Sequence, residues 1–165
     1  MLIAHISDLH QLSLSGARLA QLAGKRITGA LNLLFNRAGK YPAEVARQLL
    51  ADVRGQRPDH LLVSGDITNL ALEGEFAAVA RLLGRAGLDP ADITVVPGNH
   101  DYYARDSVRD DPFCRHLRPY LAGDEQPGPG RFPLLRLRGE LAIVALNTGR
   151  PSPPLMAHGT LGGRQ

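Results

Sequence analysis

Short apolar runs alternate with longer segments of helical periodicity through the first hundred residues. The apolar runs are Leu2–Ile6, Leu61–Val63 and Ile93–Val96. Each run is nearly continuous, which is typical of strands covered on both faces of a sheet. The order strand, helix, strand, helix, strand predicts an α/β fold with a parallel sheet and right-handed crossovers.

Two helices are expected between these strands. The first begins near Ala43, directly after Pro42, and its expected apolar stripe is Val45, Leu49, Leu50 and Val53. The second begins at Glu73 and ends before Gly87, and its expected stripe is Phe76, Val79, Ala80 and Leu83.

The rest of the chain has a different pattern. A short helix is expected within Asp110–Leu121, followed by a loop rich in glycine and proline at Gly123–Gly130. Two further apolar runs meet at Arg138–Glu140, which predicts an antiparallel hairpin. Since neither an internal repeat nor a linker is evident, residues 1–165 are expected to form a single domain.

Lys25–Lys40 forms a separate amphipathic segment with basic residues at both ends. Ile27, Leu31, Leu34 and Phe35 recur on one helical stripe. The favoured interpretation is a helix packed on the body of the domain, because amphipathic helices most often face a core. A membrane-surface helix or a lid is the alternative.

The composition is that of an ordinary soluble domain, with 44% hydrophobic and 21% charged residues. Neither a transmembrane run nor a signal peptide is evident, and a single cysteine, Cys114, fits a reducing compartment, so a cytoplasmic location is expected. The net charge is +3, and the basic residues are scattered along the chain. Neither a nucleic acid nor a membrane is therefore the expected partner.

Metal-competent side chains follow each of the three predicted strands. The loops are Ser7–His10, Ser64–Asn69 and Pro97–Asp101. Because the carboxyl ends of parallel strands share one edge, all three loops are expected to border one crevice. Each loop alone also fits ordinary turn chemistry, and it is their combination that indicates a metal site.

Carboxylates combined with imidazoles suit Zn, Mn, Fe or similar divalent ions. Asp8 and His10 are spaced so that both side chains of an extended loop point the same way. Asp66 lies on the middle loop in sequence and is placed to bridge two ions about 3.5–4 Å apart.

The motifs "DLH", "GDITN" and "GNHD" resemble those of the calcineurin-like metallophosphoesterases. The resemblance covers the first hundred residues specifically and the hairpin loosely. Within the family the chain is most similar to the bacterial cyclic-nucleotide phosphodiesterase-like branch, because "SGDITN" precedes the acidic segment Glu73–Glu75. The resemblance implies a layered β-sheet core with flanking helices. It also implies hydrolysis of a phosphomonoester or phosphodiester by a hydroxide bridging two divalent ions, which would be Mn, Fe or Zn.

The resemblance also implies a role for each matching residue. The implied metal ligands are Asp8, His10, Asp66 and Asn99. His100 would face the substrate and protonate the leaving group, as suits an imidazole that titrates near neutrality. Asp101 would hold the His100 ring in orientation. Asn69 would contact the ligand residues without binding the metal itself.

The sequence departs from the family pattern after the hairpin. The family's later histidine motifs, including Gly-His-x-His, are absent, and His158 is the only histidine after His116. The fold is therefore expected to be incomplete at its C-terminus. Truncation of an active enzyme is the favoured explanation, because the remaining motifs are intact. One alternative is that a partner chain supplies the missing histidines, and a homo-oligomer is left open. Another is a non-catalytic metal-binding or regulatory remnant. A DNA-end nuclease is a further alternative, motivated by the excess of arginine.

Overall fold

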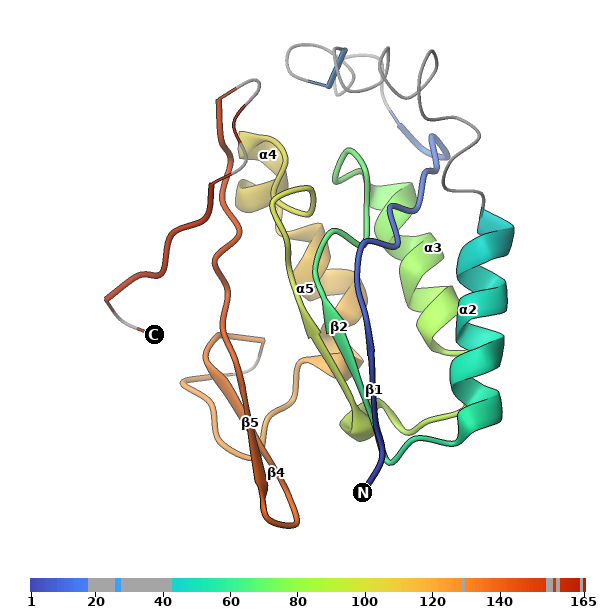
Figure 1. Ribbon diagram of the computed structural model, residues 1–165. Helices are drawn as coiled ribbons and strands as arrows, with labels where there is room; N and C mark the ends of the chain where they lie inside the picture. Colours follow the sequence, from blue (N-terminus) through green and yellow to red (C-terminus); the bar gives the residue numbers. More distant parts are fainter. Residues whose placement is uncertain (18–25, 28–42, 129, 154–155, 157, 164) are drawn as a thin grey trace.

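The computed structural model describes residues 1–17, 26–27, 43–128, 130–153, 156, 158–163 and 165. Strands β1 (Ile3–Ile6), β2 (His60–Ser64) and β3 (Ile93–Val96) form a parallel sheet in the order β1-β2-β3. Helix α2 (Ala43–Gln56) precedes β2, and helix α3 (Glu73–Leu83) precedes β3 (Figure 1). The predicted alternation of parallel strands and helices is confirmed.

Helices α2 and α3 cover one face of this sheet. The buried stripe of α3 contains Phe76, Val79 and Leu83, as predicted. The prediction for α2 was partly wrong, because Val45 and Leu49 are exposed. The buried positions of α2 are Ala46, Leu50 and Val53, which recur at the i, i+4, i+7 spacing of one helical face.

The predicted hairpin is present beside the other face. Strands β4 (Leu134–Arg138) and β5 (Leu141–Ala145) pair antiparallel and are joined by Gly139 and Glu140. A cleft of about 160 Å³ separates β5 from the sheet. On the sheet side of this cleft, the His5 ring lies 2.6 Å from the Ser64 hydroxyl.

The expected helix within Asp110–Leu121 is broken into two pieces, α5 (Pro112–Leu117) and η4 (Arg118–Tyr120). Pro112 starts α5, where its missing N–H is not needed. The Phe113 ring on α5 packs edge-on against Phe76 of α3, with centroids 6.2 Å apart. Two short elements, η3 (Pro90–Asp92) and α4 (Arg105–Arg109), were not predicted.

Most of the segment predicted as an amphipathic helix, Lys25–Lys40, lies outside the described residues, which include only Arg26 and Ile27 of it. Among the helices that are described, none combines the length and the apolar character needed to cross a bilayer.

Candidate metal centre

The loops after β1 and β2 continue the strand pairing beyond the regular sheet. The Asp8 amide donates to the Gly65 carbonyl at 3.1 Å, and the His10 amide donates to the Asp66 carbonyl at 3.0 Å. The pairing ends in an isolated bridge between Gln11 and Thr68. These backbone bonds fix the two loops side by side, so the side chains of Asp8, His10 and Asp66 emerge at one edge of the sheet.

The same three residues have left-handed backbones. The φ angles of Asp8, His10 and Asp66 are 57°, 42° and 50°. This conformation is uncommon for residues with a side chain, although Asp and His adopt it more readily than most. Such conformations persist where the surroundings over-determine them, and they concentrate at functional sites.

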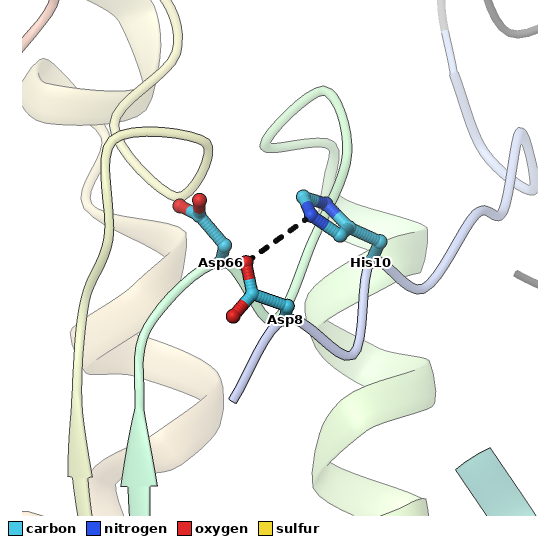
Figure 2. A group of neighbouring side chains, drawn as sticks. All are labelled: Asp8, His10 and Asp66. Carbon is cyan, nitrogen blue, oxygen red and sulfur yellow. Dashed lines mark ion pairs between the residues drawn. The ribbon is translucent and has the colours of Figure 1, made fainter. Parts of the chain in front are cut away.

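The structure brings Asp8, His10 and Asp66 together at the carboxyl edge of the sheet (Figure 2). One ligand atom from each residue lies within 4.8 Å of the others. Asp8 Oδ1 lies 3.6 Å from His10 Nε2. Asp8 is exposed and His10 is buried, so the group opens to solvent on the Asp8 side. Two carboxylates and one imidazole at this spacing form a donor set suited to a divalent transition metal.

His100 borders this group from the third loop. Its backbone amide donates to Asp66 Oδ1 at 2.9 Å. Its ring meets the His10 ring edge-on, with centroids 4.9 Å apart. The Nδ1 atom lies 2.8 Å from the Asn69 carbonyl oxygen. Since a carbonyl can only accept, Nδ1 must carry the proton, and Nε2 remains the nitrogen available for other partners.

The Asp101 carboxylate does not make the expected contact with the His100 ring. It is fully buried and accepts from the backbone amides of Gly98 and Thr68 at 2.8 and 3.0 Å. It also accepts from the Thr68 hydroxyl at 2.8 Å and from the Ile67 amide at 3.4 Å. Asp101 therefore ties the loop after β3 to the loop after β2. The reason is that buried amides require acceptors, and the Asn69 carbonyl already occupies Nδ1 of His100.

Two glycines allow the loops after β2 and β3 to touch. A Cβ atom on Gly65 would lie 2.7 Å from the Gly98 nitrogen. A Cβ atom on Gly98 would overlap Asp66 Oδ1 and lie 2.5 Å from the Asp66 nitrogen. Any side chain at these positions would push Asp66 away from the third loop.

Burial shifts the pKa values of two groups at this edge. It lowers the pKa of His10, with a further contribution from the His100 charge and an opposing one from Asp66 and Asp8. A neutral imidazole is the form that binds a metal. Burial also raises the pKa of Asp101 to about 6, although the bonds from Gly98 and Thr68 favour its charged form.

The remaining candidate residues occupy different places. Asn99 is half-buried between Gly98 and His100 on the third loop, and its role as a ligand stays a prediction. Asn69 is buried, and its side-chain amide donates to the His10 carbonyl. His158 lies in the tail, where its Nε2 is 2.8 Å from an Arg150 nitrogen.

Thr68 is a contributor that the sequence did not single out. Both its amide and its hydroxyl bind Asp101, and its own side chain is fully buried. A threonine in a turn has many local uses, so periodicity and spacing provide no signal for this contact.

Comparisons with known proteins agree with this geometry. The profile of the calcineurin-like phosphoesterase family matches residues 1–160. The chain is also 32% identical over 126 residues to the glycerophosphodiester phosphodiesterase GpdQ of Enterobacter lignolyticus (strain SCF1). That match covers 76% of this chain and 37% of the relative, so the chain spans well under half of the relative's length. The similarity to a bacterial phosphodiesterase supports the predicted branch. The chain belongs to the calcineurin-like phosphoesterase family.

Proposed function

We propose that this protein is a metal-dependent phosphoesterase that hydrolyses a phosphomonoester or a phosphodiester. The observation that carries the proposal is the convergence of Asp8, His10 and Asp66, whose ligand atoms lie within 4.8 Å of one another beside His100. Family membership supports it independently.

We propose that the site holds two divalent ions, which would be Mn, Fe or Zn. Asp8 and His10 would hold the first ion, Asp66 would be shared, and Asn99 would bind the second. When bound, the ions would act as Lewis acids on the phosphoryl group and lower the pKa of a water nucleophile. The left-handed backbones of Asp8, His10 and Asp66 would hold the ligands in place before any ion arrives.

His100 is proposed as the group that meets the substrate. Its Nδ1 proton is committed to the Asn69 carbonyl, so Nε2 is the atom that would contact a phosphoryl oxygen. In the protonated ring, Nε2–H would donate its proton to the leaving-group oxygen. Asp101 would contribute indirectly, by fixing the backbone on both sides of the site.

The name of the bacterial relative makes phosphodiesters the first substrates to test. That relative is a glycerophosphodiester phosphodiesterase, so glycerophosphodiesters belong beside a generic aryl phosphodiester in the assay.

The test compares the wild-type chain with Asp66→Asn. After dialysis against Mn²⁺, bound metal is measured by atomic emission, and hydrolysis is followed with bis(p-nitrophenyl) phosphate and p-nitrophenyl phosphate. We expect Asp66→Asn to lose at least about 100-fold in kcat/KM together with bound metal, since it removes the shared anionic ligand. Asp52→Asn, an exposed change on α2, is the matched control.

Unchanged metal content and turnover in Asp66→Asn would refute the proposal. Metal binding that depends on Asp66 without turnover of any tested ester would instead favour a metal-binding module without catalysis. The number of ligands supports that second function. The group has three His, Asp or Glu ligands among the described residues, which is few for a centre of two ions.

A further inference from the structure

The loop from Thr68 to Leu72 forms hydrogen bonds with both His10 and His100. The Asn69 carbonyl accepts from His100 Nδ1 at 2.8 Å, and the Asn69 side-chain amide donates to the His10 carbonyl. Ala71, two residues further on, has a left-handed backbone with φ of 53°. An alanine resists this conformation, so the loop needs contacts that hold it there.

Glu75 provides such contacts from the first turn of α3. Its side chain is fully buried. Its Oε2 atom accepts from the Leu70 amide at 2.9 Å and from the Leu72 amide at 3.1 Å. These two amides lie on either side of Ala71. One carboxylate oxygen therefore fixes the left-handed residue in place.

Arg26 holds the opposite side of the same loop. Its Nε donates to the Leu70 carbonyl at 2.8 Å, and a terminal nitrogen donates to the Ala71 carbonyl at 3.3 Å. The other terminal nitrogen pairs with Asp106 of α4 at 2.6 Å. Two amides of the loop thus bind the buried Glu75 carboxylate, and two of its carbonyls bind the buried Arg26 guanidinium.

The role of Glu75 goes beyond capping a helix. A capping glutamate is normally exposed, whereas Glu75 is fully buried and its other oxygen, Oε1, has no hydrogen-bond partner among the described residues. Burial raises the pKa of Glu75 to about 7, while the two amide bonds and Arg26 favour the charged form. Moving this side chain would leave two buried amides unpaired, which restricts it to one position.

We propose that Glu75 is a positioning residue for His100. By holding the Leu70 and Leu72 amides it fixes the Asn69 carbonyl, which keeps the His100 proton on Nδ1 and presents Nε2 to the substrate. The effect of Glu75 on catalysis rests on the proposed function. Its effect on the His100 ring does not.

The test measures the tautomer of His100 directly, by long-range ¹H–¹⁵N NMR at a pH where the ring is neutral. Glu75→Asp shortens the side chain by one methylene, so it cannot reach both amides. We expect the ratio of Nδ1–H to Nε2–H tautomers to fall about fivefold or more, as expected when one hydrogen bond is lost. Glu75→Gln keeps an oxygen at the position of Oε2 and should retain the wild-type ratio.

Two controls separate positioning from loss of stability. Val79→Ala removes buried volume from the same helix but no hydrogen-bonding side-chain atom, and it should destabilise the protein without changing the His100 tautomer. In a chain with measurable hydrolysis, Glu75→Asp should lower kcat by about tenfold with KM within about twofold, since it misplaces a group used in the transition state.

The proposal is overturned if Glu75→Asp leaves the tautomer ratio unchanged, or if Val79→Ala or Glu75→Gln shifts it equally. The NMR measurement does not depend on turnover. A chain that hydrolyses none of the tested esters but shows the tautomer shift would therefore contradict the proposed function and support the role of Glu75.

Discussion

At the scale of single residues, the candidate metal centre depends on unusual backbone conformations. Asp8, His10 and Asp66 are all left-handed, and each is held by a bond to the neighbouring loop: the Asp8 and His10 amides donate, and Asp66 accepts. This arrangement fixes the ligands in the folded chain, so little ordering is left for the ion to impose.

A substitution at Gly98 would test whether the loops after β2 and β3 must approach each other this closely. Gly98→Ala would place a Cβ atom 2.5 Å from the Asp66 backbone nitrogen, so the two loops would have to separate. We expect a loss of about 2–3 kcal/mol in unfolding free energy and at least about tenfold weaker Mn²⁺ binding. Urea denaturation and isothermal titration calorimetry measure the two effects.

Gly55→Ala is the control for this substitution. Gly55 lies in the last turn of α2, and a Cβ atom there meets nothing within 4 Å. Alanine at this position should stabilise the protein by about 0.5–1 kcal/mol, because it restricts the unfolded chain. An equal response of both variants would show that the close approach at Gly98 is unimportant.

At the scale of elements, the hairpin is joined to the rest of the domain by a buried arginine. Arg136 of β4 is fully buried, and its guanidinium donates to the carbonyls of Pro90 and Tyr120 at 3.3 and 2.7 Å and also to the Ala91 carbonyl. These carbonyls belong to η3 and η4. Arg138 adds an ion pair to Asp92 at 3.5 Å, so two arginines of β4 help to position the hairpin relative to β3.

Arg136→Met should loosen the hairpin. Methionine fills a similar volume but removes the donor to the Tyr120 carbonyl, while the Ala91 carbonyl keeps its hydrogen bond from Arg138. We therefore expect a loss of about 1–3 kcal/mol in unfolding free energy. Urea denaturation measures the loss, and limited proteolysis at the Gly123–Gly128 loop should accelerate. The exposed change Arg131→Met should leave both unchanged. Wild-type stability in Arg136→Met would show that the guanidinium contributes no net stabilisation.

At the scale of the whole molecule, the candidate centre couples parts of the chain that are distant in sequence. Asp8 follows β1, Asp66 follows β2 and His100 follows β3, and all three loops lie at one edge of the sheet. An ion bound there would hold the three strand ends together only in the folded state. Metal binding should therefore be visible as global stability.

Saturating Mn²⁺ should raise the melting temperature. At an ion concentration 100 times the dissociation constant, the expected gain is about 2.7 kcal/mol, or roughly 5–10 °C for a domain of this size. Differential scanning calorimetry with Mn²⁺, and again after chelation, measures the shift. Asp52→Asn should retain the shift and Asp66→Asn should lose it. A shift of equal size in Asp66→Asn would place the ion elsewhere.

Most of the fold and the core of the candidate centre could be predicted from the sequence. The apolar runs define the three strands, and helical periodicity defines α2 and α3, because burial of apolar side chains imposes these spacings locally. The convergence of Asp8, His10 and Asp66 followed from one rule, that parallel strands end at one edge. The family resemblance added the roles proposed for Asn99 and His100.

The tertiary structure alone decided which atoms meet. Asp101 was expected to bind the His100 ring, but it accepts from Gly98 and Thr68, while the Asn69 carbonyl binds that ring. Hydrogen-bond partners depend on distances between residues far apart in the chain, and those distances are set only when the loops pack. The sequence by itself determined the strand ends and the chemistry available at them. The partners of each side chain, and the burial of Glu75, were determined by packing.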